Sequence, residues 1–144
     1  MGAATSQAPA QEDPPHMSPS TELLLVEDDV LLARALERTL QARGVRVRHV
    51  ACCALASMLT GPFPIGVFDI ELPDGDGIEL ARLLRSRGVV CRVVFYTACT
   101  EPQRLARARE LGSVFVKTAH LPTLLELSPR AAEAELRPGS TASA

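Results

Sequence analysis

The sequence predicts an α/β fold in which a parallel sheet is covered by helices on both faces. Short, continuously apolar runs recur along the chain, as is typical of strands that are buried on both faces of a sheet. Between these runs lie segments whose apolar residues recur at helical spacing, and glycines stop several of them. Five strands that alternate with five helices indicate that helical crossovers join neighbouring parallel strands.

The first half of this pattern contains three strands and two helices. Leu23–Val26 is a continuously apolar run and predicts a buried strand. Val30–Arg43 has leucines and alanines at helical spacing and ends before a glycine. Val45–Val50 alternates valine with arginine or histidine, which predicts a half-exposed strand. Ala51–Leu59 predicts a helix that a Gly-Pro pair stops, and Ile65–Ile70 predicts the next buried strand.

The second half continues the alternation. Ile78–Ser86 has leucines at helical spacing and predicts a helix, and Val89–Tyr96 is a long apolar run that predicts a strand. Pro102–Leu111 predicts a helix that begins with a proline and ends before a glycine. Val114–Val116 predicts a short strand, and Leu121–Leu127 predicts a last, brief helix.

The ends of the chain differ in composition from its middle. Residues 1–20 are rich in Ala, Pro, Ser and Gln, and residues 129–144 are similar. Such segments bury too little apolar surface to offset the entropy of ordering them. We therefore expect a disordered N-terminal tail over 1–20, one folded domain over 21–128 and a flexible C-terminal tail over 129–144.

Composition excludes several classes of function. Fifteen basic and 17 acidic residues give a net charge of −2, so no basic excess favours nucleic acid or an anionic membrane. Apolar runs are too short to span a bilayer, and no signal-peptide pattern is present, so we expect a cytoplasmic protein. The four cysteines show no CxxC spacing and are expected to be buried thiols. Lys117 is the only lysine among the 15 basic residues.

Acidic, hydroxyl and amine side chains follow four of the five predicted strands. Ligands of open parallel sheets bind beyond the C-terminal strand ends, so these positions are the candidate site. Glu27 and Asp28 follow the first strand, and Asp69 ends the third. Thr97 ends the fourth and Lys117 ends the fifth, whereas the second strand ends without a functional side chain.

Each of these strand ends lies in a motif that resembles a known family. The motifs are Leu-Val-Glu-Asp-Asp (25–29), Phe-Asp-Ile-Glu-Leu-Pro-Asp-Gly-Asp-Gly (68–77), Tyr-Thr-Ala (96–98) and Phe-Val-Lys (115–117). In this order they resemble the receiver domain of bacterial two-component response regulators, of the CheY-like single-domain type, over residues 22–128. The resemblance implies a three-layer flavodoxin-like (βα)5 sandwich whose parallel five-stranded sheet has the order 2-1-3-4-5.

The resemblance also implies a role for each side chain. Asp69 is the implied phosphoacceptor, a carboxylate nucleophile. Lys117 is expected to pair with Asp69 and then with a phosphate oxygen. Thr97 is expected to donate its hydroxyl proton to another phosphate oxygen and to act as a switch with the position held by Val114.

A divalent cation is the implied cofactor. Glu27 and Asp28 add like charges beside Asp69, which is unfavourable unless a cation joins them. Oxygen-only ligation with room for water suits Mg²⁺. Asp28 and Asp69 are the expected direct ligands together with the backbone carbonyl of Glu71, and Glu27 is expected to act through water.

Structural explanations exist for several of the same acids. Asp29 lies where it can cap the first helix. Asp74-Gly75-Asp76-Gly77 is typical of a turn that begins a helix. This segment is not a calcium loop of the EF-hand type, because Ile78 occupies the place of the third oxygen ligand.

Some positions depart from the family pattern. Thr118 follows the lysine where proline is usual, and Val114 stands where Tyr or Phe is usual. The last helix is brief. These changes fall on the face that receivers use for switching and dimerisation, so the dimer mode is left open.

The sequence thus predicts a stand-alone receiver that is phosphorylated on Asp69 in a Mg²⁺-dependent reaction. A sensor histidine kinase or phosphotransfer protein is the expected donor, and a downstream protein, rather than nucleic acid or membrane, is the expected target. No enzymatic activity is expected beyond its own phosphorylation and dephosphorylation. Two alternatives remain open at this point: a phosphorylation-independent pseudo-receiver, and a small haloacid-dehalogenase-type phosphatase suggested by Asp69-Ile70-Glu71. In the phosphatase fold, however, the nucleophile strand comes first and a cap is expected.

Overall fold

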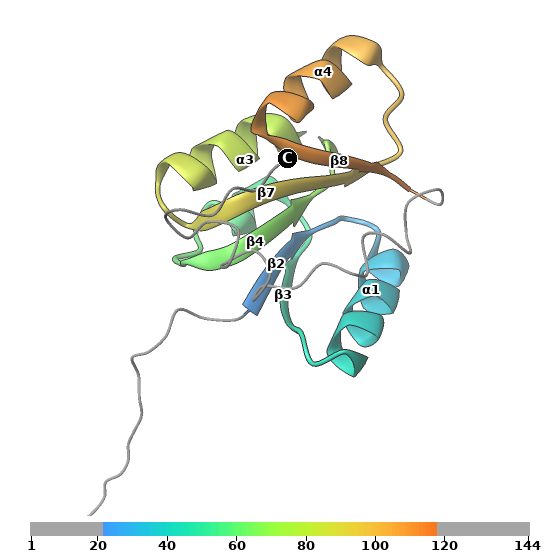
Figure 1. Cartoon of the computed structure of the whole chain (residues 1–144), viewed down its shortest axis with the longest axis vertical. Helices are drawn as coiled ribbons and strands as arrows, with labels where there is room; N and C mark the ends of the chain where they lie inside the picture. Colours follow the sequence, from blue (N-terminus) through green and yellow to red (C-terminus); the bar gives the residue numbers. More distant parts are fainter. Residues whose placement is uncertain (1–21, 118–144) are drawn as a thin grey trace, which may run out of the picture.

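A five-stranded parallel sheet forms the centre of the computed structural model, which describes residues 22–117 (Figure 1). The sheet order is β3-β2-β4-β7-β8, which confirms the predicted order 2-1-3-4-5. The strands of this sheet are β2 (Glu22–Val26), β3 (Arg46–Val50), β4 (Phe63–Phe68), β7 (Val90–Thr97) and β8 (Gly112–Val116). The helices are α1 (Val30–Ala42), α2 (Cys53–Ala56), α3 (Gly77–Ser86) and α4 (Pro102–Leu111).

Helices cover both faces of the sheet, as the apolar runs predicted. On one face, Leu36 and Leu40 of α1 pack with Leu25 of β2 and Val67 of β4. On the other face, α2, α3 and α4 contribute Ala56, Leu84 and Ala108 to a second core cluster. The alternating side chains of each strand are therefore divided between two apolar layers, and the described part of the chain has three layers.

Several predicted helix and strand boundaries were wrong, because backbone hydrogen bonds determine where an element begins and ends, and the apolar pattern does not show them. Helix α2 has only four residues rather than nine, since the N–H groups of Met58 and Leu59 bond three residues back in tight turns. Strand β4 begins at Phe63 and ends at Phe68, so Ile70 lies beyond it. Strand β8 already begins at Gly112, because its backbone pairs with Val93 and pairing does not require an apolar side chain.

An antiparallel two-stranded hairpin follows Asp69 and was not predicted as strands. It consists of β5 (Glu71–Leu72) and β6 (Gly75–Asp76). The predicted turn and helix start are confirmed at its end, where the Asp76 carboxylate accepts the Ile78 N–H at 2.9 Å and caps α3. The hairpin thus joins the segment after Asp69 to the first turn of α3.

Two other aspartates fix helix starts. Asp29 accepts the Leu32 N–H at 3.1 Å, which confirms it as the N-cap of α1. Asp74 accepts the N–H groups of Cys53 and Ala54 at 2.7 and 2.9 Å. Because these bonds hold the first N–H groups of α2, they explain why this helix begins at Cys53 rather than at Ala51.

The cysteines correct one expectation. All four are free thiols, but only Cys99 is buried, Cys52 and Cys53 are half-buried, and Cys91 is exposed. Among the described residues no helix has the length and apolar character that a membrane span requires. The predicted last helix, both tails and Thr118 lie outside the described residues.

Candidate functional site

The predicted functional side chains gather at the C-terminal ends of the central strands. Glu27 and Asp28 follow β2, Asp69 follows β4, and Lys117 follows β8. One oxygen from each of Glu27, Asp28 and Asp69 lies within 4.8 Å of the other two. Glu27 and Asp69 are buried, whereas Asp28 is exposed. We call these three carboxylates the acidic cluster.

Lys117 contacts two members of the acidic cluster. Its Nζ atom lies 2.9 Å from Asp69 Oδ2 and 3.0 Å from Glu27 Oε1. The predicted pairing with Asp69 is confirmed, and the second contact with Glu27 was not foreseen. Lys117 is also held through its backbone, because its N–H donates to the Thr97 carbonyl at 2.9 Å.

The ionisation of the site reflects burial and this pairing. Burial raises the pKa of Glu27 above its ordinary value and the charge of Asp69 adds to the increase, although hydrogen bonds from Lys117 and the Asp29 N–H oppose it. Burial alone lowers the pKa of Lys117, but its hydrogen bonds to Asp69 and Glu27 outweigh burial, and the net pKa is raised. Lys117 is therefore a stable cation, and Glu27 takes a proton more readily than a glutamate in water does.

The acidic cluster fits a divalent cation. Three carboxylates face one ammonium group, so the site retains net negative charge when all are ionised. The donors are oxygens only, as Mg²⁺ prefers, and exposed Asp28 leaves a side open to water. The residues present therefore match the chemistry of a magnesium site.

Thr97 completes the arrangement from β7. It is fully buried, and its hydroxyl oxygen accepts the Cys99 N–H at 3.1 Å. An oxygen that accepts in this way still carries its own proton for donation. The strands β2, β4, β7 and β8 therefore each supply a polar group at the same edge of the sheet.

Comparison with known proteins identifies the family. Residues 23–126 match the family described as the response regulator receiver domain. The chain belongs to this family. A curated relative, the swarming motility regulation protein RssB of Serratia marcescens, is 32% identical over 107 residues, which are 72% of this chain and 49% of that protein. This chain therefore spans about half the length of the curated relatives it matches.

Solved receiver structures share the fold. The non-phosphorylated HemR receiver domain from Leptospira biflexa is 33% identical, with a TM-score of 0.67 over 74% of this chain and 89% of that one. A CheY-like receiver domain protein from Methanospirillum hungatei is 24% identical, with a TM-score of 0.64 over 74% and 88%. Receiver membership establishes this chain as a two-component signalling domain and argues against the phosphatase alternative.

One receiver position that the sequence missed lies on the edge strand. His49 of β3 donates from Nε2 to the backbone carbonyl of Glu27 at 2.7 Å. Sequence reasoning did not foresee this contact, which joins the edge strand to the backbone of an acidic-cluster residue. The half-exposed alternation of this strand was visible, but the cross-strand contact depends on pairing of β3 with β2, which a local pattern does not show.

The predicted switch position is a half-buried valine in this receiver. Val114 of β8 packs against the core cluster that α3 and α4 line. Its pairing partner is Phe95 of β7, and its neighbour Phe115 packs on the opposite face, against the cluster of α1. The large ring of β8 therefore faces α1 rather than α4.

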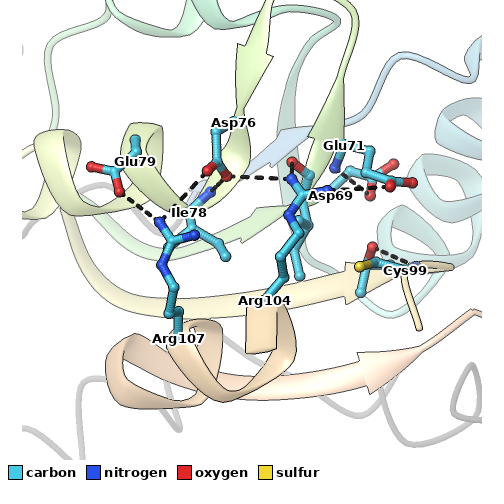
Figure 2. Close-up of polar contacts among 10 residues, drawn as sticks. Asp69, Glu71, Asp76, Ile78, Glu79, Cys99, Arg104 and Arg107 are labelled. Atoms are coloured by element: carbon cyan, nitrogen blue, oxygen red, sulfur yellow. Dashed lines mark hydrogen bonds and ion pairs between the residues drawn. The ribbon is translucent and has the colours of Figure 1, made fainter. Parts of the chain in front are cut away.

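Two arginines of α4 are the other residues that sequence reasoning missed (Figure 2). Arg104 lies 3.3 Å from the Glu71 carboxylate and 3.7 Å from that of Asp76. Arg107 lies 2.8 Å from the Glu79 carboxylate and 3.7 Å from that of Asp76. We call these five residues the arginine cluster. The spacing of the arginines by three along a predicted helix was a signal that they share a face.

Glu71 is placed differently from the other acids. Its backbone N–H donates to Asp69 Oδ1 at 3.3 Å, but its carboxylate bonds with Arg104. The sequence predicted its backbone carbonyl as a metal ligand and did not foresee the contact of its side chain with Arg104. The structure assigns its side chain to the arginine cluster.

Proposed function

We propose that this receiver takes a phosphoryl group on Asp69 in a Mg²⁺-dependent reaction and signals by contact with another protein. The observation that carries the proposal is the contact of Lys117 with both Asp69 and Glu27 inside the acidic cluster. A cation fixed beside a buried carboxylate nucleophile, with further acids arranged for a metal, is the arrangement that phosphoryl transfer needs.

The proposed step makes one bond and breaks one. A carboxylate oxygen of Asp69 forms a bond to phosphorus, while the bond from phosphorus to the donor breaks and the donor retains that electron pair. Bound Mg²⁺ supplies positive charge to the phosphoryl oxygens. Asp28, Asp69 and the Glu71 carbonyl are the proposed direct ligands, with Glu27 acting through water.

Lys117 and Thr97 have separate proposed roles. Lys117 holds the Asp69 carboxylate before transfer and a phosphate oxygen afterwards. Thr97 donates its hydroxyl proton to a second phosphate oxygen, which draws the loop after β7 toward the site. The proposed switch pairs Thr97 with Val114, whose small side chain replaces the usual ring.

Receiver domains interact with histidine kinases, so we propose a sensor histidine kinase or a phosphotransfer protein as donor. We further propose that the domain works in the cytoplasm and acts as a stand-alone receiver. The matched residues span only about half the length of the curated relatives, so the second point needs a direct test. The size of the native protein in cell extracts tests it, and a band much larger than 15.4 kDa contradicts it.

The experiment is phosphorylation by acetyl phosphate with Mg²⁺, read by intact mass. We expect one added phosphoryl group in the wild type and none in Asp69→Asn or with excess chelator. An adduct that persists in Asp69→Asn overturns the assignment. The absence of Tyr or Phe at 114 favours a pseudo-receiver as second candidate, and unchanged binding to a target and unchanged signalling in Asp69→Asn are its expected results.

A further inference from the structure

Arg104 connects α4 directly to the segment that presents Asp69. Besides its ion pairs, its Nη2 atom donates to the Ile70 carbonyl at 3.5 Å. The same carbonyl accepts the Gly77 N–H at 2.8 Å, and the next residue, Glu71, donates its N–H to Asp69. The guanidinium therefore contacts the two residues that follow the candidate phosphoacceptor, from a helix more than 30 positions further along the chain.

Arg107 provides the natural contrast within the same helix. It lies one turn further along α4 and contacts Asp76 and Glu79, which begin α3. Its ion pairs are with these two residues rather than with residues 69–71, and its side chain is 43% exposed against 25% for Arg104. The two arginines share chemistry and helix, but only Arg104 contacts the segment after Asp69 (Figure 2).

The carboxylate of Glu71 is the group within reach of the Asp69 site that Arg104 pairs with. It is 60% exposed and belongs to the second residue after Asp69, so a change of rotamer can bring it toward the acidic cluster. That cluster already contains three carboxylates and one lysine. A further negative charge at its opening repels an incoming anion and attracts a cation.

We propose that Arg104 is a positioning residue of the Asp69 site: it holds the Glu71 carboxylate on α4 and thereby keeps the approach to Asp69 open to an anionic phosphodonor. The inference rests on the proposed function. It concerns the approach of the donor and adds no group to the transfer step itself.

The proposal predicts opposite effects on cations and anions, which structural damage does not. In Arg104→Ala we expect phosphorylation by acetyl phosphate to slow roughly three- to tenfold at low salt. Mg²⁺ affinity, measured by calorimetry, is expected to stay equal or to increase. Both effects are expected to shrink at high salt, because exposed charges are screened.

Two further variants separate the charge from the contact. In the double variant Arg104→Ala with Glu71→Gln, the released side chain is neutral, and we expect the phosphorylation rate to return to within about twofold of the wild type. Arg107→Ala is the matched control, and we expect it to leave both the rate and the Mg²⁺ affinity unchanged.

Each result decides the proposal. Loss of both rate and Mg²⁺ affinity in Arg104→Ala, or no recovery in the double variant, overturns it, as does an unchanged rate. If the wild type binds Mg²⁺ but takes up no phosphoryl group, the proposed function fails, while the Mg²⁺ affinities still test the effect of Arg104 on the charge of the site. A wild type that neither binds Mg²⁺ nor takes up a phosphoryl group overturns both the proposed function and the role of Arg104.

Discussion

Two clusters of charged side chains, joined by the segment after Asp69, differ in burial and in charge balance. The acidic cluster contains three carboxylates, two of which contact Lys117, and the side chains of Glu27 and Asp69 are only 2% and 8% exposed. In the arginine cluster, three carboxylates face two guanidinium groups, and every side chain is at least 25% exposed. With every group ionised, the exposed arginine cluster retains one net negative charge, whereas the mostly buried acidic cluster retains two.

This difference separates a site from a structural tie. Water screens the arginine cluster, so its ion pairs contribute little to stability. Apart from the positioning role proposed for Arg104, they hold the side chains of α4 against the start of α3. Burial makes the imbalance of the acidic cluster costly, and a bound cation relieves that cost. Excess buried charge, rather than the number of ion pairs, therefore marks the functional end of the sheet.

Removal of Lys117 is expected to cause the largest change in the free energy of unfolding. In Lys117→Ala, Glu27 and Asp69 lose their shared cation, and we expect the free energy of unfolding without Mg²⁺ to fall by roughly 2–4 kcal/mol. Urea unfolding followed by circular dichroism measures it. Lys117→Arg retains the charge and is expected to lose less stability, but the wider guanidinium group fits poorly between two carboxylates and is expected to slow phosphorylation.

The pH dependence of Lys117→Ala follows from Glu27. A folded-state pKa raised above the ordinary value of 4.5 means that the folded protein binds more protons than the unfolded chain above that pH. Stability therefore decreases as pH rises through this window, and the loss in the variant is expected to be larger at pH 8 than at pH 5. A loss that is equal at both values, or that Mg²⁺ does not change, contradicts the account.

Gly77 lies where the start of α3 approaches the backbone of Asp69 closely. A methyl group at this position would overlap the carbonyl of Asp69, so the backbone must move. We expect Gly77→Ala to lower the free energy of unfolding by roughly 1–3 kcal/mol. Gly75→Ala is the matched control, because a Cβ there meets only the Cys53 side chain, at 3.0 Å or more. Equal losses in both variants exclude the close approach as the cause.

The sequence predicted the sheet and the acidic cluster because both depend on local patterns. Buried strands are apolar runs, and the residue after each strand must lie at the same sheet edge in a parallel fold. Glu27, Asp69 and Lys117 were therefore predicted to converge before any contact was known. The strand order and the metal ligands came from resemblance to the family rather than from the pattern.

The contacts of His49 and Arg104 could not be predicted in the same way. His49 reaches Glu27 because β3 pairs with β2, and Arg104 reaches Glu71 because α4 packs beside α3 and the hairpin. Such contacts depend on how elements far apart in the chain pack together. The short α2 has a similar cause, since Asp74, about 20 residues away, determines where that helix begins.

A substitution in the arginine cluster is expected to change stability much less than one in the acidic cluster. Because Arg107 is 43% exposed and its partners are exposed as well, we expect Arg107→Ala to lower the free energy of unfolding by less than about 1 kcal/mol. The loss is expected to vanish in high salt, in contrast to that of Lys117→Ala. A loss as large as that of Lys117→Ala would show that exposed and buried charges do not differ here.

A still smaller effect concerns Asp74, an exposed acid that bonds backbone N–H groups instead of a cation. These bonds lower its own pKa, while burial and then the charge of Asp74 raise the pKa of the Cys53 thiol to about 11. Asp74→Asn removes the charge and retains an oxygen acceptor, so the Cys53 pKa is expected to fall toward 9.0 but not to reach it, because burial remains.

At pH 8.5 a larger thiolate fraction then reacts, and we expect faster alkylation of Cys53 by iodoacetamide in this variant. Peptide mass spectrometry measures the rate with exposed Cys91 as internal reference. If Cys91 accelerates equally, the variant has loosened the fold. If the alkylation rate of Cys53 does not change, the carboxylate does not control the thiol, and the electrostatic influence of this exposed acid does not extend to the half-buried thiol beside it.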